Sequence, residues 1–242
     1  TIAWPLVRRK LVLDSWHTAA VEGVIDLLGA VNVRRDGMAS NSVDVAVARY
    51  TESFQNDDFA ALIDLSTAME AVLIDEADGT DGLSARLRAR AAALLSTPTD
   101  SAANVFGDVK RLYDLRSRFV HGANLTEKRL RETVLQISTI TEPRAFGVAV
   151  AQAVDRMRDL TRRSILARVC LSMDESAGWP FRTSKSMDVV FADSDASRHL
   201  RESWQRTLAH IGAAHAWSAL PAAVELLRED FGPKTAADGH PD

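Results

Sequence analysis

The sequence has little of the residues that interrupt helices, and it has almost no cysteine. Only 12 glycines and 7 prolines occur among 242 residues, and aromatic residues make up 6% of the chain. Cysteine occurs once, at Cys170, which excludes a disulfide within the chain. Because Cys170 lies in an apolar helical run, we expect it in the hydrophobic core. The scarcity of Gly and Pro beside abundant Ala, Leu and Arg favours an all-α fold.

The sequence also lacks the motifs of metal and cofactor chemistry. It contains no paired cysteines, no H-E-x-x-H, no P-loop, no G-x-S-x-G and no G-x-G-x-x-G. His199 and His210 would fall about 20° apart around a helix, but about 16 Å apart along its axis, which is too far to share one ion. The sequence therefore predicts no metal site and no cofactor.

The charge and hydropathy of the chain are ordinary. Hydrophobic residues make up 46% and charged residues 26%, with a formal net charge of −4. A negative chain is not expected to coat nucleic acid non-specifically, although a local basic groove is compatible with it. No uncharged apolar stretch of membrane-spanning length and no signal-peptide pattern occurs, so we expect no membrane association and a cytoplasmic location.

Composition and periodicity divide the chain into four parts. Residues 1–42 are expected to form an N-terminal extension, and residues 43–175 a helical domain. Residues 176–231 are expected to form a C-terminal linker with helices, and residues 232–242 a disordered tail. The expected fold is therefore an all-α bundle with additional N- and C-terminal helical elements.

Apolar spacing predicts five helices in the helical domain. The second is apolar nearly all round and should be central, packed antiparallel against the fourth. The first is expected to start after Ser42, and the second after a cap at Asp57 or Asp58. The third should run from Leu83 to Leu95. The fourth should start after a cap at Asp100 or Ser101, and the fifth should run from Pro143 to about Met173.

The flanking parts carry weaker patterns. Leu6–Leu13 and Val189–Phe191 are candidates for short strands. A helix is expected from Ser15 to Leu28 and another from Ala196 to Ile211, with a short last one starting at Pro221.

One short segment carries the residues best suited to catalysis. It runs from Leu112 to Gly122 with the sequence LYDLRSRFVHG. Arg116 supplies a planar cation that matches phosphate oxygens. His121, five residues later, is of the type that most readily exchanges a proton near neutral pH. The alternative interpretation is a helix C-terminus with favourable cations in its last turn and a glycine cap.

About 75 residues that end on this segment resemble the HEPN superfamily, in particular the ApeA-like HEPN proteins. The spacing of the "LY", "RS" and "HG" pairs is fairly specific, whereas the preceding blocks share mostly a helical apolar pattern. The resemblance implies an HEPN-like helical bundle. The blocks that carry it are Arg49-Tyr50 through Phe54, Asp64–Leu73, Leu83–Leu95, Leu112-Tyr113, Arg116-Ser117 and His121-Gly122.

The resemblance implies a metal-independent endoribonuclease with Arg116 and His121 as catalytic residues. In that family, the motifs of two protomers form one composite cleft, so a homodimer is implied. The RNA 2′-OH attacks the adjacent phosphate, and a cyclic phosphate forms. Such domains commonly serve in phage defence or in toxin–antitoxin modules, with an antitoxin or effector as partner. On a regular helix the two side chains would differ by about 140°, so the pair needs a distorted last turn or a site at a helix end.

Three neighbours on the same segment are candidate supporting residues. Ser117 matches the ApeA-like subgroup and can donate to a phosphate, but it cannot orient His121 as a carboxylate would. Arg118 lies on nearly the same side as His121, where it either contacts phosphate or is a solvated cation. Tyr113 is expected to be a packed aromatic residue whose hydroxyl reaches the edge of the cleft.

Glu70 is a further candidate, because it lies within an apolar run where an isolated charge would be costly. It should therefore meet a cation. Arg116 is one candidate partner, and a structural ion pair with Arg86 or Arg90 is the alternative.

Two broader interpretations remain open. Arg158 and Arg162 share a helix face and, with Lys110 and Arg111, form either a stripe that tracks RNA or an ordinary solvated surface. For the whole chain, catalysis competes with a non-catalytic HEPN module that binds RNA or protein, and with a purely structural dimerisation domain.

Overall fold

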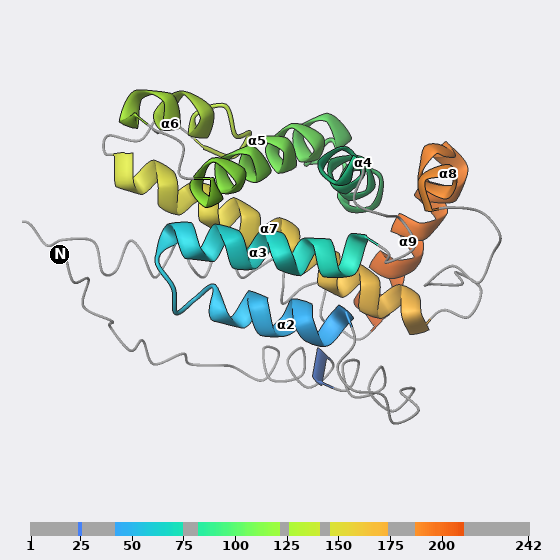
Figure 1. Cartoon of the computed structure of the whole chain (residues 1–242). Helices are drawn as coiled ribbons and strands as arrows, with labels where there is room; N and C mark the ends of the chain where they lie inside the picture. The colour runs from blue at the N-terminus through green and yellow to red at the C-terminus, as the bar shows by residue number, and fades with distance from the viewer. Residues whose placement is uncertain are drawn as a thin grey trace, which may run out of the picture.

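Helices form the regular structure of the chain (Figure 1). The computed structural model describes residues 24–25, 42–74, 82–121, 126–140, 146–173 and 187–210. Within these ranges no β-strand occurs, which confirms the all-α fold class. The helices are α2 (Ser42–Glu52), α3 (Asp58–Leu73), α4 (Leu83–Leu95), α5 (Ala102–Val120), α6 (Glu127–Val134), α7 (Phe146–Met173), α8 (Met187–Ala192) and α9 (Ser194–His210).

Side-chain caps fix the starts of two core helices. Asp57 caps α3, because its carboxylate accepts hydrogen bonds from the backbone N–H groups of Phe59 and Ala60 at 3.0 and 2.9 Å. Ser101 caps α5 through its hydroxyl, which accepts from the N–H of Asn104 at 3.2 Å. The cap of α3 is therefore Asp57 and not Asp58, and the cap of α5 is Ser101 and not Asp100. Asp100, the residue not used as a cap, is free to bind arginines instead.

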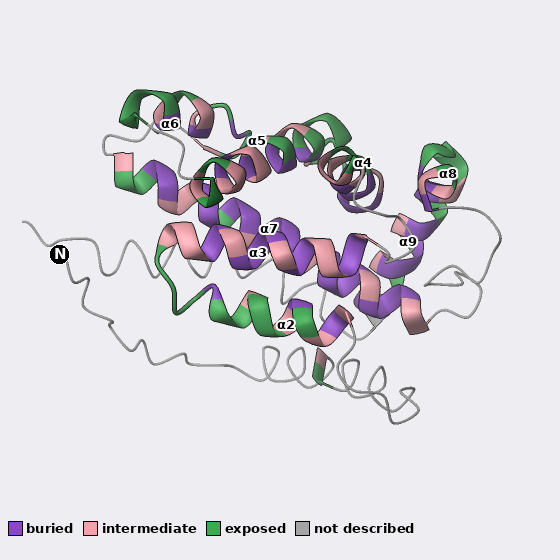
Figure 2. Cartoon of the chain, in the orientation of Figure 1, coloured by how far each residue is buried: buried purple, intermediate pink, exposed green. Residues whose placement is uncertain are grey.

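Helix α7 is the long central element of the bundle. It packs against α3 and also contacts α2, α4, α5, α6 and α9, and α2 packs against α3 as well. Buried residues recur along its whole length (Figure 2). The expected cysteine is among them, since Cys170 is fully buried. Burial raises the pKa of its thiol to about 12, so this cysteine remains an unreactive core residue.

The second and fourth predicted helices, α3 and α5, are in contact as expected, but neither is the other's main partner. Helix α5 packs mainly on α4, whereas α7 runs beside α3. The two predicted partners still touch in antiparallel sense. Phe119, near the end of α5, packs on Phe59 at the start of α3, and Tyr113 reaches back to Glu70. The physical reason is length: α7 has 28 residues, of which 15 are buried, whereas α5 has 19 residues, of which 5 are buried.

The predicted strand at Val189–Phe191 was also wrong. These residues belong to α8, in which Met187 and Phe191 are both buried. A four-residue spacing places them on one side of a helix, and no neighbouring strand is available among the described residues to satisfy an extended backbone. The strand expected at Leu6–Leu13 and the tail lie outside the described residues.

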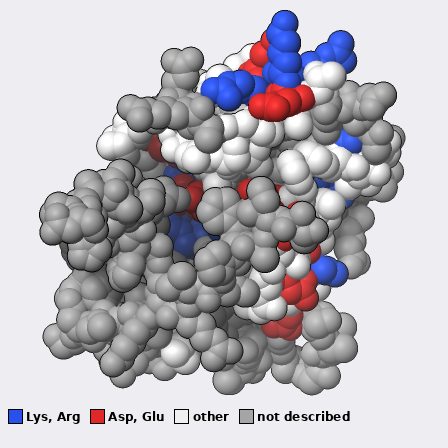
Figure 3. All heavy atoms as spheres, turned by 90° about the vertical axis from the view of Figure 1, so that its left-hand side faces the viewer, with Lys and Arg blue, Asp and Glu red and all other residues white. Residues whose placement is uncertain are grey.

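Helix α6 was not predicted at all. It is one of the shorter helices, and only Leu130 and Val134 bury apolar side chains, so its periodicity is barely visible in the sequence. The hydroxyl of Thr126 caps it by accepting from the N–H of Arg129. The helix lies on α5 and α7. Basic side chains project at the top of the face seen in Figure 3, where α6 lies, with acidic ones beside them.

The C-terminal helices close the end of α4. Three of its last carbonyl groups accept hydrogen bonds from side chains of other helices: Ala93 from Arg201, Leu94 from the indole of Trp204 at 3.1 Å, and Leu95 from Arg163 at 3.0 Å. Carbonyls at a helix end have no partner within the helix, so these donors allow the end to be buried. Helix α9 is therefore part of the bundle and not a loose appendage.

Candidate functional site

The two predicted catalytic residues flank the end of α5. Arg116 lies in its last turns and is partly buried, whereas His121 is the exposed C-cap residue. The backbone N–H of His121 donates to the carbonyl of Ser117 at 3.1 Å, and its φ and ψ are −88° and 6°. The sequence allowed either a distorted last turn or a site at a helix end, and the pair lies at a helix end. Gly122 lies outside the described residues.

Tyr113 connects α5 to α3 beneath this turn. Its hydroxyl donates to Oε1 of Glu70 at 2.7 Å. Burial raises the pKa of Tyr113 to about 12, the adjacent Glu70 carboxylate adds to the rise, and Arg116 opposes it. The hydroxyl consequently stays protonated near neutral pH and acts as a hydrogen-bond donor, not as a base.

Glu70 meets this tyrosine where the sequence predicted a cation. Arg90, one of the expected alternatives, is fully buried and donates instead to Asp188 and to the carbonyl of Leu73, both at 2.9 Å. Arg86 likewise approaches Asp188, at 3.3 Å. Neither of these ion pairs of Glu70 forms, because both arginines bind Asp188 instead.

Arg116 is left without a carboxylate partner among the described residues. Its guanidinium lies over the ring of Tyr113, 5.5 Å from the ring centroid, and its buried Nε has no hydrogen-bond partner. A cation–π contact orients a guanidinium without neutralising its charge. Arg116 thus keeps a positive charge for an anion at the end of α5. Ser117 is partly buried beside it, and Arg118 is exposed.

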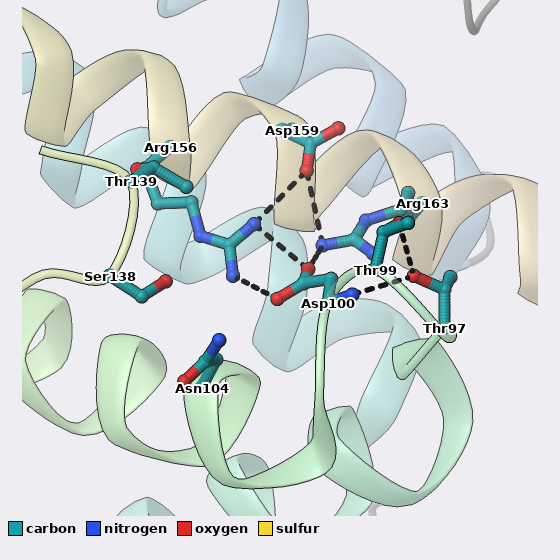
Figure 4. A pocket seen from close by; sticks show the side chains of 9 residues that line it. All are labelled: Thr97, Thr99, Asp100, Asn104, Ser138, Thr139, Arg156, Asp159 and Arg163. Carbon is teal, nitrogen blue, oxygen red and sulfur yellow. Dashed lines mark hydrogen bonds and ion pairs between the residues drawn. The ribbon is translucent and has the colours of Figure 1, made fainter.

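A second polar cluster lies away from this turn, around an open cavity of about 380 Å³ (Figure 4). Arg156 donates from Nε to Asp108 and from Nη2 to Asp100, both at 2.9 Å. Arg163 donates from Nη2 to Asp100 at 2.5 Å and approaches Asp159 at 3.1 Å. The lining residues are Thr97, Thr99, Asp100, Asn104, Ser138, Thr139, Arg156, Asp159 and Arg163.

This cluster is a structural ion network, because its guanidinium groups are already paired with carboxylates. An anionic ligand would have to displace Asp100, which joins both arginines. The sequence contained one signal for it: Arg156, Asp159 and Arg163 fall on one face of α7. The other partners of the two arginines, Asp108 and Asp100, are 48 to 63 residues away in the chain, and nothing in the spacing identifies them.

The predicted RNA-tracking stripe is neutralised by the same kind of pairing. Arg158 meets Asp155 at 3.0 Å, and Arg162 meets Asp159 at 2.5 Å. Across on α5, Lys110 pairs with Asp114 at 3.2 Å and Arg111 lies 3.6 Å from Asp108. These ion pairs leave the stripe less positive charge for phosphates, and the Arg158 and Arg162 side chains are only 20% and 15% exposed, so they are less solvated than either interpretation expected.

Asp100 makes the stability of the fold dependent on pH. Burial alone would raise its pKa, but the hydrogen bonds and charges of Arg156 and Arg163 outweigh burial and hold that pKa below its usual value. Such a carboxylate stabilises the fold above its unfolded pKa of about 3.9, and this contribution is lost as the pH falls through the lower folded value.

We therefore expect the free energy of unfolding to decrease as the pH drops below about 4, and to decrease less steeply in Asp100→Asn than in the parent. Urea unfolding followed by circular dichroism at a series of pH values measures the slope. Asp195→Asn removes a carboxylate that is 79% exposed and serves as control. The same acid slope in Asp100→Asn and in the parent would contradict the assignment.

The described ranges contain no group of three or more His, Cys, Asp or Glu side chains placed to hold a metal ion. None of the helices there combines the length and apolarity needed to cross a membrane. In comparisons with known proteins, no family model matches the chain, and neither a curated protein nor a solved structure matches it.

Proposed function

We propose that the chain is a metal-independent endoribonuclease of the HEPN type, with Arg116 and His121 as its catalytic residues. The observation that carries the proposal is the end of α5, where an exposed histidine follows an arginine that no described carboxylate neutralises. A cation for the phosphate and a group for proton transfer are thus available on one turn and its cap. The motif's resemblance to HEPN proteins is the second support.

In the proposed reaction, the substrate supplies the nucleophile. The 2′-OH of RNA attacks the adjacent phosphorus, and the bond to the 5′ oxygen of the next nucleotide breaks. His121 takes the proton of the 2′-OH or gives one to the leaving oxygen, and Arg116 stabilises the charge that develops on the phosphate. The products are a 2′,3′-cyclic phosphate and a free 5′-OH. DNA has no 2′-OH and should not react.

The proposal includes a homodimer with two copies of this turn near a two-fold axis. A single copy of each residue at a helix end cannot enclose a phosphate, whereas a two-fold interface doubles the site. Val120, which is 50% exposed immediately before His121, gives this end of α5 an apolar residue for such a contact. We place the activity in the cytoplasm, in phage defence or a toxin–antitoxin module, because that is where the resemblance points.

The test is incubation of the purified chain with end-labelled RNA in EDTA, beside DNA of the same sequence. We expect cleavage of the RNA alone, with cyclic-phosphate ends that a phosphatase removes only after acid treatment. Sedimentation of the same sample at tens of micromolar reports whether it is a dimer. Cleavage that stops in EDTA, or that is equally fast on the RNA and on the DNA, would refute the proposed chemistry.

The alternative is a non-catalytic module that binds RNA or a protein partner through the same turn. One observation favours it: no described residue forms a hydrogen bond with the His121 imidazole, so none of them fixes the orientation of the ring. Productive proton transfer needs a positioned ring. RNA that binds without being cut, by a chain that sediments as a dimer, would support this alternative.

A further inference from the structure

Three exposed cations of α5 and α6 have no carboxylate partner among the described residues. No ion pair joins the side chains of Arg118, Lys128 or Arg129 to a carboxylate of the described residues, and both Lys128 and Arg129 are exposed on α6. Ion pairs do neutralise arginines on α2, α4, α7 and α9, namely Arg49, Arg86, Arg90, Arg156, Arg158, Arg162, Arg163 and Arg198.

Two hydrogen bonds show how α6 is oriented relative to the end of α5 at His121. Arg111 donates to the side chain of Gln136, and the N–H of Ser138 donates to Asp108, so the residues after α6 return to the middle of α5. Helix α6 therefore runs back along α5, with its first turn at the end where α5 stops. Thr126 follows His121 by five residues, which limits their Cα separation to about 18 Å.

We propose that Arg118, Lys128 and Arg129, here called the α6 strip, bind RNA phosphates and lead the strand to His121. The proposal takes its RNA substrate from the function proposed above and adds the surface that holds it. Between positions 116 and 131 the sequence contains five cations and one carboxylate, in a chain of net charge −4. The five are Arg116, Arg118, Lys128, Arg129 and Arg131.

The chemistry of the strip favours phosphate contact over reading of bases. Its members are long, exposed cations that attract phosphates and give an affinity that depends on salt. Two carboxylates on the same helix, Glu127 and Glu132, moderate the potential, and Figure 3 shows acidic side chains among the basic ones there. We therefore expect binding without strong sequence preference.

The experiment uses a non-cleaving His121→Ala background, so that RNA binding is measured without turnover. Lys128→Gln/Arg129→Gln removes two charges from α6. Arg198→Gln/Arg206→Gln removes two exposed charges from α9 and changes the net charge equally. Fluorescence anisotropy with a labelled single-stranded RNA is recorded over a range of salt concentrations for each protein.

The α6 pair should lower the slope of log affinity against log salt by about 1.4, which is about 25-fold in affinity at 0.1 M salt. The α9 pair should leave the slope as in the background protein. Equal salt slopes for the α6 and α9 double variants would refute RNA binding by the α6 strip. The α6 cations would then fit an acidic protein partner better. If the α6 double variant weakens RNA binding but the parent never cleaves RNA, RNA binding by the strip is supported and the proposed nuclease activity is refuted.

Discussion

Replacement of His121 by alanine is expected to lower the rate of RNA cleavage by about 10² to 10⁴-fold, the usual contribution of a positioned acid–base group. RNA binding should be retained, because the imidazole forms no structural hydrogen bond with the described residues. The rate is measured by single-turnover cleavage in EDTA, and binding by anisotropy. His199→Ala is the matched control, since His199 is also an exposed helical histidine, on α9.

Arg116 provides an independent arm of the same test. Arg116→Ala should weaken both cleavage and binding, because it removes a phosphate contact together with charge stabilisation. Arg116→Lys should restore activity only in part, since an ammonium keeps the charge but lacks the planar fork. A His121→Ala protein that cleaves as fast as the parent would end the catalytic interpretation. The chain would then be described better as a helical module for binding and dimerisation.

Replacement of Arg156 by methionine is expected to cost about 3–5 kcal/mol of unfolding free energy, as for other broken buried ion pairs. The Arg156 side chain is 4% exposed, and its partner Asp108 is fully buried. Methionine keeps much of the volume but leaves the Asp108 carboxylate without its closest cation. Arg111 remains, at 3.6 Å, and Ser138 still donates to the carboxylate from its N–H and hydroxyl.

Urea unfolding followed by circular dichroism measures this loss. Adding Asp108→Asn to Arg156→Met should recover part of it, because the asparagine oxygen still accepts from Ser138 and no unpaired charge stays buried. Arg198→Met, which breaks a pair exposed by 61% and 79%, should change stability by less than about 1 kcal/mol. A loss no larger in Arg156→Met than in this control would show that the network contributes little.

The sequence by itself determined the helices whose signals are local. The apolar spacing and flanking breaks placed α4 at Leu83–Leu95, and a capping aspartate placed the start of α3. The same signals put Arg116 and His121 at the end of one helix. Side-chain caps and helical periodicity act within a few residues, so they can be read along the chain. Helix α6 was not predicted because its two buried apolar residues are too few to show a helical period.

Only the tertiary structure decided which charges remain available. Arg156 and Arg163 on α7 are neutralised by Asp100 and Asp108, which come from another part of the chain. Glu70 meets Tyr113 and leaves Arg116 with its charge unpaired. Coulombic energy depends on distance in space and on burial, not on separation in sequence. Helix packing sets both, and neither can be read from separation along the chain.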